Sequence, residues 1–106
     1  MKQVILIISA LKMPKGKTAA MASHASVEAV LNSDKSKIDS WKKLGMKKVI
    51  LKVNSEKELL EFQKKAAGVE LTTALITDAG KTFFKTPTIT CLAIGPDKDE
   101  KIDKLT

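Results

Sequence analysis

Two segments of the sequence combine glycine with lysine and could hold a negatively charged ligand. They span residues 12–17 and 78–82, and each follows an apolar run. Glycine lets the backbone approach a ligand closely. Gly16 and Lys17 also stand at an expected helix start, where free amides and the helix dipole attract anions. Either segment alone is a weak signal of an anion site, but both at one edge of a sheet would be a persuasive one.

A second candidate feature is the helical spacing of Lys17, Met21 and His24. Residues at i, i+4 and i+7 share one face of a helix, so His24 could approach the same site as Lys17. It could equally pack against the sheet or bond a backbone carbonyl. One histidine and the distant Cys91 do not make a ligand set, so we expect no metal. Cys91 is expected to be a small core residue rather than a nucleophile.

Strands alternate with helices along the chain. Strands are expected at residues 4–8, 49–53, 71–77 and 88–94, and helices at 17–31, 38–44, 55–68 and 97–105. Ser55 with Glu58, and Asp97 with Glu100, are expected to cap the last two helices. The pattern predicts a single α/β domain over residues 1–106: a three-layer sandwich whose mixed, mostly parallel four-stranded sheet carries helices on both faces.

The third and fourth expected strands are joined by about ten residues without a helical pattern, so we expect them to pair antiparallel. We further expect the antiparallel strand to lie at one edge of the sheet. In open α/β sheets, ligands bind beyond the carboxyl ends of the parallel strands. Both glycine–lysine segments leave strands at that predicted edge, which places the candidate site there.

Charge points to a polyanionic partner. The 106 residues include 19 basic and 12 acidic side chains, for a net charge of +7. This excess is typical of nucleic-acid binding, although solvated lysine faces would also explain it. All the basic residues are lysines, and the absence of arginine argues against sequence readout of DNA. The apolar run at 4–8 is too short for a secretion signal or membrane span, so we expect a cytoplasmic protein with no membrane partner.

Four stretches resemble a known family in order and spacing. Residues 16–25, 47–53, 73–82 and 88–96 are similar to the archaeal and eukaryotic type of peptidyl-tRNA hydrolase, the type 2 family. The resemblance implies hydrolysis of the ester that joins a peptide to the terminal ribose of tRNA, without metal or cofactor. It implies a catalytic cluster of Lys17, His24, Asp78, Thr82 and Thr90. Substrate contacts are expected from Lys12, Lys15, Gly16, Gly80, Lys81 and Thr88.

Each of these residues has an expected role and a structural alternative. Asp78 would orient or deprotonate a water molecule, and Lys17 would stabilise the developing oxyanion. The two threonines would hold water or the terminal adenosine, and His24 would support Lys17 or move a proton. Alternatively, Asp78 and Lys17 form only a surface ion pair, the threonines serve the strands, and the loop lysines are merely solvated.

The sequence departs from the family at several positions. Met21 and Phe83 replace usual glutamines, Lys81 replaces a common arginine, and Pro87 replaces a usual glycine. The sequence also ends at Thr106, where family members continue into a short tail containing glycine and leucine. These departures leave two other functions open. One is a non-catalytic protein that binds tRNA or another RNA, and the other is a protein adaptor using Phe83 and Phe84. The exposed phenylalanine could also join a homodimer partner.

Overall fold

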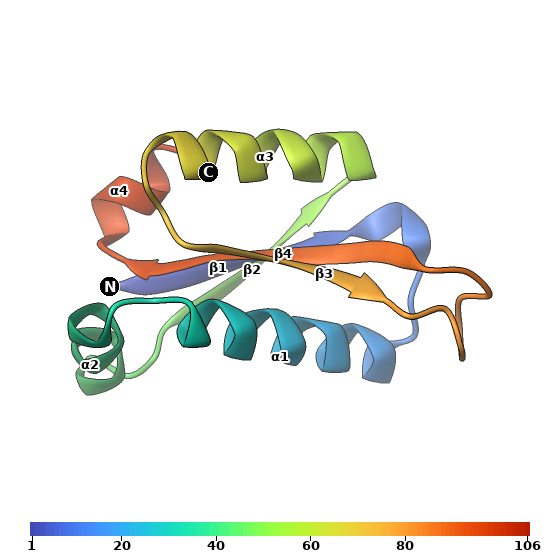
Figure 1. Cartoon of the computed structure of the whole chain (residues 1–106), viewed down its shortest axis with the longest axis horizontal. Helices are drawn as coiled ribbons and strands as arrows, with labels where there is room; N and C mark the ends of the chain where they lie inside the picture. The colour runs from blue at the N-terminus through green and yellow to red at the C-terminus, as the bar shows by residue number, and fades with distance from the viewer.

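A four-stranded sheet with strand order β2–β1–β4–β3 forms the centre of the protein (Figure 1). The computed structural model describes all residues from 1 to 106. In chain order the elements are β1 (Lys2–Ile8), a 3-10 turn (Ser9–Leu11), α1 (Lys15–Leu31), α2 (Lys35–Lys43), β2 (Lys48–Val53), α3 (Glu56–Gly68), β3 (Thr73–Asp78), β4 (Thr88–Asp97) and α4 (Asp99–Asp103). None of these helices combines the length and apolar character that crossing a membrane requires.

The prediction of a mostly parallel sheet was wrong. Only β1 and β2 pair in parallel, whereas β4 pairs antiparallel with both β1 and β3. The predicted antiparallel pairing of β3 with β4 is confirmed, but β4 is a central strand rather than an edge strand. Because β4 lies between them, β1 and β3 still run in the same direction. Their carboxyl ends therefore meet at one edge of the sheet, as the candidate site required.

Helices cover both faces of the sheet, which confirms the three-layer arrangement. Figure 1 shows α3 and α4 on one face and α1 on the other, with α2 beyond the end of α1. Side chains of β1 and β4 alternate between two buried clusters, one beneath α3 and α4 and the other beneath α1. Because helices cover both faces, the central residues of these two strands are buried and form apolar runs without polar alternation.

Alanines let α1 lie close to the sheet. Ala25 and Ala29 are fully buried against β-strand residues such as Ala74 and Ala93, so small side chains face one another across this layer. A larger residue at either position would push the helix away from the sheet, because protein cores are packed as densely as crystals.

We expect Ala29→Leu to lower the free energy of unfolding by about 1 to 3 kcal/mol, because the added carbons find no space beneath α1. Urea unfolding followed by circular dichroism measures the change. Ala19→Leu is the matched control, since Ala19 is exposed on the same helix. An equal loss in both variants would show that helix propensity, rather than packing on the sheet, is responsible.

The two expected helix caps had different outcomes. Ser55 caps α3 as predicted: its Oγ accepts from the Glu58 backbone N–H at 3.2 Å, and the Glu58 carboxylate accepts from the Asn54 N–H at 2.9 Å. The predicted cap by Asp97 was wrong. Asp97 is the last residue of β4, and its carboxylate accepts from the backbone N–H of Lys98 and from the ammonium group of Lys37 on α2.

A β-bulge interrupts the pairing of β3 with β4 close to the candidate site. Ile76 pairs with Cys91 and Thr77 pairs with Ile89, so Thr90 is the extra residue on β4. The Thr90 Oγ donates to the Ile76 carbonyl oxygen at 3.2 Å, which places a side-chain hydrogen bond where the ladder is broken. Bulges of this kind bend a strand and redirect the side chains that follow. Here the neighbouring residues include the end of β3 at Asp78.

Candidate active site

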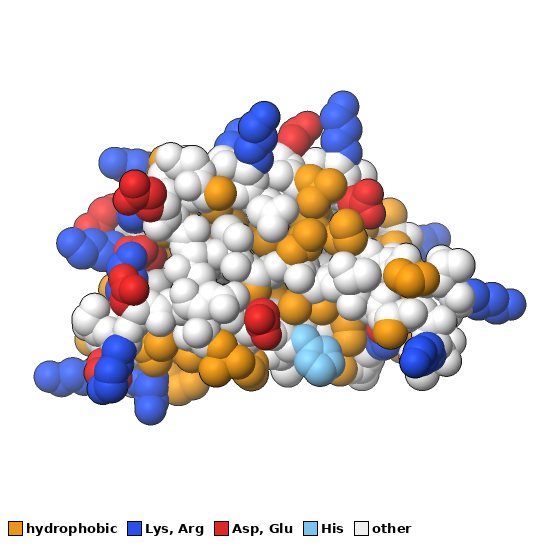
Figure 2. Space-filling view, in the orientation of Figure 1, with side chains coloured by type: hydrophobic (Ala, Val, Ile, Leu, Met, Phe, Trp, Pro, Cys, Tyr) orange, Lys and Arg blue, Asp and Glu red, His pale blue; other side chains and the backbone are white.

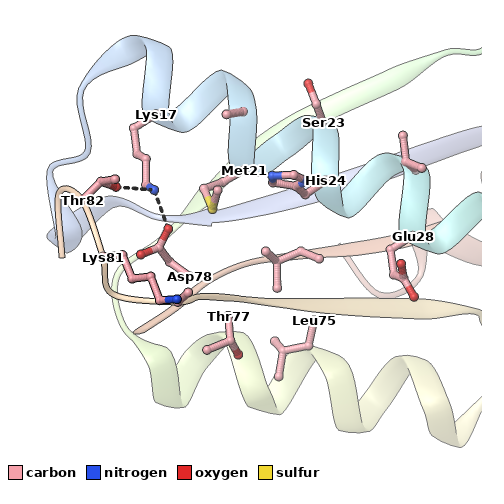
Figure 3. A pocket seen from close by; sticks show the side chains of 14 residues that line it. Lys17, Met21, Ser23, His24, Glu28, Leu75, Thr77, Asp78, Lys81 and Thr82 are labelled. Atoms are coloured by element: carbon pink, nitrogen blue, oxygen red, sulfur yellow. Dashed lines mark hydrogen bonds and ion pairs between the residues drawn. The ribbon is translucent and has the colours of Figure 1, made fainter. Parts of the chain in front are cut away.

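An open groove of about 980 Å³ runs between α1 and the edge strand β3 (Figure 3). We call it the α1–β3 groove. Its lining comes from α1, from β3 and from the first residues of the loop that follows β3. The lining residues are Lys17, Ala20, Met21, Ser23, His24, Val27, Glu28, Leu75, Ile76, Thr77, Asp78, Ala79, Lys81 and Thr82.

Lys17 and Asp78 meet at one end of this groove. The Lys17 ammonium group donates a hydrogen bond to Asp78 Oδ1, and its Nζ lies 3.3 Å from Thr82 Oγ1 (Figure 3). Lys17 comes from the first turn of α1, whereas Asp78 is the last residue of β3. The Asp78 side chain is 8% exposed and that of Lys17 is 18% exposed. The pair therefore lies in a partly enclosed site, unlike an ion pair held in open solvent.

Hydrogen bonds to its carboxylate lower the pKa of Asp78. The bond from Lys17 has the larger effect, and the backbone N–H of Gly80 adds a second bond to Oδ2 at 2.9 Å. Both bonds favour the ionised form, so Asp78 is a carboxylate at neutral pH. Each of its oxygens has a further lone pair with which to accept a hydrogen bond from a ligand or water molecule.

Gly80 shapes the turn that follows Asp78. Its φ is +79°, a left-handed conformation that glycine adopts readily. A Cβ atom at this position would lie 2.2 Å from the backbone carbon of Thr86, so the turn has no room for any side chain. This close crossing of the loop over itself holds the Gly80 N–H against Asp78. Gly16 differs, because a Cβ there would meet no atom within 4 Å.

The predicted helical face of α1 is confirmed. Lys17, Met21 and His24 all line the α1–β3 groove (Figure 3), and of these His24 is exposed whereas Met21 is buried. Met21 also belongs to the cluster that packs α1 on the sheet. His24 makes no side-chain hydrogen bond to Lys17, whose ammonium is directed to Asp78 and Thr82.

Sequence reasoning missed the far end of the groove. Extending the same helical spacing beyond His24 leads to Val27 and Glu28, so the sequence did contain that signal. On β3, the residues Leu75 and Thr77 also line the groove. No pattern in the sequence could have identified them, because their access depends on β3 being an edge strand.

Several residues expected at the site lie outside the lining of this groove. Thr90 is fully buried in β4, and Thr88 pairs with Asp78 across the sheet while its hydroxyl donates to the Thr86 carbonyl. Lys15 and Gly16 are exposed in the first turn of α1. Lys12 lies beside a smaller neighbouring pocket of about 240 Å³, which Lys52 of β2 also lines. The lysines and Gly16 therefore lie at the same edge of the sheet as the candidate site but outside the groove.

The remaining reactive side chains do not form a second site. Burial raises the pKa of the Cys91 thiol to about 11, so this cysteine is protonated at neutral pH. Nowhere in the chain do three or more His, Cys, Asp or Glu side chains cluster in a way that could hold a metal ion. In the loop after β3, Phe83 is exposed, and its ring packs edge-on against Phe84 with centroids 4.9 Å apart.

Comparison with known proteins identifies the family. The family model described as "Peptidyl-tRNA hydrolase PTH2" matches residues 1–106. A peptidyl-tRNA hydrolase of Methanothermobacter thermautotrophicus is 51% identical over 106 residues, covering 100% of this chain and 95% of its own. A second, of Methanocaldococcus jannaschii, is 47% identical over 109 residues with the same coverage. A third, of Haloquadratum walsbyi, is 44% identical over 106 residues. The chain therefore belongs to the peptidyl-tRNA hydrolase PTH2 family.

Proposed function

We propose that this protein hydrolyses the ester bond of peptidyl-tRNA at the Lys17–Asp78 end of the α1–β3 groove, releasing free tRNA and peptide. Membership of the family supports the reaction. One structural observation carries the placement of the site: a carboxylate, an ammonium group and the Thr82 hydroxyl converge at the end of an open groove. A carboxylate and a cation in this arrangement suit the attack of water on an ester carbonyl.

Asp78 orients the attacking water. One carboxylate lone pair accepts a hydrogen bond from the water, whose oxygen forms a bond to the ester carbon. The bond between that carbon and the ribose oxygen then breaks, and the proton lost by the water ends on the ribose oxygen. Because hydrogen bonds keep the pKa of Asp78 low, the group is a weak base, and it acts mainly by holding the water in position.

Lys17 stabilises the charge that develops on the ester carbonyl oxygen. A lysine ammonium group has three N–H donors. Asp78 accepts one hydrogen bond and Thr82 lies close enough to accept the second, so the third is available to the oxyanion. Fixed donors in a partly enclosed site stabilise such charge more strongly than water does. We propose that His24, which also lines the groove, assists in proton movement.

Thr90 supports the site from inside the sheet. Its hydroxyl bonds the Ile76 carbonyl at the bulge, two residues before Asp78. We expect Thr90→Val to lower the free energy of unfolding by about 1 to 3 kcal/mol, since the partly buried Ile76 carbonyl loses its partner. Turnover should fall as well, because losing the hydrogen bond at the bulge should displace Asp78. Thr90→Ser keeps the hydroxyl and should retain both stability and turnover; a serine variant as impaired as the valine variant would contradict this role.

Lysines around the groove provide attraction for tRNA phosphates. Lys81 lines the groove. Lys12 lies beside the smaller pocket, and Lys15 and Gly16 lie in the first turn of α1, at the same edge of the sheet. Figure 2 shows other lysine side chains spread over the visible face rather than gathered in one patch. We propose that Gly80 and Thr88 hold the turn against which the tRNA terminus lies. Attraction of this diffuse kind makes binding weaken steeply as salt concentration rises.

The reaction is tested with an N-acetylated aminoacyl-tRNA in a single-turnover assay. We expect the protein to release free tRNA and the N-acetyl amino acid, measured by acid precipitation of labelled substrate. A preparation that binds the same tRNA, with affinity falling as salt rises, but releases nothing would contradict hydrolysis. That result would support the alternative of a non-catalytic tRNA-binding protein.

A further inference from the structure

The α1–β3 groove extends well beyond Lys17 and Asp78, and the reaction proposed above gives this longer part no role. The apolar side chains in its lining are Leu75 and Ile76 of β3 and Met21 and Val27 of α1. Ile76 packs with Met21 on the α1 side of the sheet. Figure 3 shows the Leu75 side chain on the other side of β3, in keeping with its packing against the cluster beneath α3 and α4. We call these four residues the apolar arm. A groove whose apolar part opens directly onto a reactive site is suited to hold the part of a substrate adjoining the reacting bond.

The apolar arm lies along the free edge of β3. Five consecutive residues, 75–79, line the groove. Successive side chains of a strand point to opposite faces, so consecutive residues line one groove together only when it runs along the strand's edge. β3 is the last strand in the sheet order, with β4 on one side and no strand on the other.

Backbone groups of β3 are unpaired at this edge. The Gly95 N–H donates to the Thr72 carbonyl at 2.9 Å, so these two residues form a hydrogen-bonded pair. In an antiparallel ladder such pairs alternate with non-bonded pairs. The pairs of Thr73 with Ile94 and of Leu75 with Leu92 are therefore non-bonded. The N–H and carbonyl groups of Thr73 and Leu75 consequently point away from β4, along the free edge.

We propose that the peptide of the substrate binds in the apolar arm as an added strand, parallel to β3. This inference rests on the proposed ester hydrolysis at Asp78. The ester carbonyl belongs to the C-terminal residue of the peptide, which must lie at the carboxyl end of β3. The preceding residues of the peptide then lie beside Leu75 and Thr73, so the peptide runs from its N- to its C-terminal end in the same direction as β3. Main-chain hydrogen bonds of this kind accept any peptide sequence.

The dimensions of the groove limit the length of the bound peptide. From Lys17 to Glu28, α1 advances about 16 Å along its axis. An extended peptide advances about 3.3 Å per residue, so the whole groove accommodates about five residues. Residues beyond that number pass the end of the groove and add no contacts.

The first test is a series of N-acetylated peptidyl-tRNAs that share one tRNA and one C-terminal residue but differ in peptide length. We expect kcat/KM to rise about tenfold or more between one residue and about five, and then to level off. A flat dependence with hydrolysis intact would overturn the added-strand inference while leaving the proposed function standing. If no member of the series is hydrolysed, the proposed function itself fails.

Backbone methylation of the peptide tests the pairing directly. In a parallel added strand, the amides of alternate peptide residues face β3. N-methylation at one alternating set should lower kcat/KM about fivefold per position, and methylation of the other set should have little effect. Equal effects at every position would overturn the pairing.

A matched pair of variants tests the location. Val27 and Leu31 are both apolar residues on α1, 58% and 73% exposed, but only Val27 lines the groove. We expect Val27→Glu to lower kcat/KM for a pentapeptidyl-tRNA about tenfold, with a smaller effect on the N-acetyl aminoacyl substrate. Leu31→Glu should change neither. Equal effects of Val27→Glu on both substrates, or no effect, would overturn the placement of the peptide.

Discussion

Asp78→Asn is expected to lower single-turnover hydrolysis of N-acetyl aminoacyl-tRNA roughly 100- to 10,000-fold. Asparagine has the shape of aspartate and can still accept the hydrogen bond from Gly80. It lacks the negative charge that pairs with Lys17 and that we propose holds the attacking water. Rates measured at saturating enzyme report the chemical step, and binding of the same tRNA by a filter assay reports substrate affinity. We expect the affinity to remain within a few-fold of the parent.

Asp97→Asn is a matched control for this experiment. Like Asp78, Asp97 is almost fully buried, and its carboxylate accepts one hydrogen bond from a backbone N–H, that of Lys98, at 2.7 Å. It also pairs with a helix lysine, Lys37, at 2.9 Å. It lies at the opposite end of the strands, outside the groove. Asp97→Asn should therefore reduce stability without reducing turnover. Equal loss of turnover in the two variants would mean that Asp78 acts only through the stability of the fold.

Lys17→Met is expected to lower the same rate roughly 100- to 1,000-fold, the usual effect of removing one donor to an oxyanion. Methionine keeps much of the length and the apolar stem of lysine, so the first turn of α1 should remain intact. Lys17→Arg is not a safe substitute, because a planar guanidinium group presents its donors differently. If Lys17→Met retained near-parental turnover, the oxyanion role of Lys17 would be refuted.

The same variant predicts a change in pH dependence. Lys17 is the main cause of the lowered pKa of Asp78, so its removal raises that pKa toward the ordinary value for aspartate. In a plot of the variant's remaining rate against pH, the fall on the acidic side should then occur at higher pH than in the parent. Stability should respond as well: the Asp78 ion pair stabilises the parent above the unfolded-state pKa and is lost as pH falls through the folded-state pKa. The stability difference between parent and variant should therefore narrow at acidic pH. If the acidic fall of the rate occurred at the same pH in both proteins, a group other than Asp78 would control it.

Local sequence signals predicted the elements and one face of the site. The Ser55–Glu58 cap, the alanines of α1 and the spacing of Lys17, Met21 and His24 depend on neighbours within a few residues in the chain. For such features the physical cause is written in the sequence itself: helix periodicity, capping groups and small side chains. The same holds for the antiparallel pairing of β3 with β4, because nine residues between them, 79–87, leave no room for a crossover helix.

Only the tertiary structure decided where β4 lies. Strand order depends on which strands bury both faces, and β4 is buried along nearly its whole length whereas β2 is largely exposed. Placing β4 in the centre makes β3 an edge strand, which opens the α1–β3 groove and leaves Leu75 accessible. It also places the Thr90 bulge beside Asp78 and directs Asp97 to Lys37 instead of to the start of α4. These contacts join residues far apart in the chain, so their energies depend on the assembled sheet and leave no local pattern in the sequence.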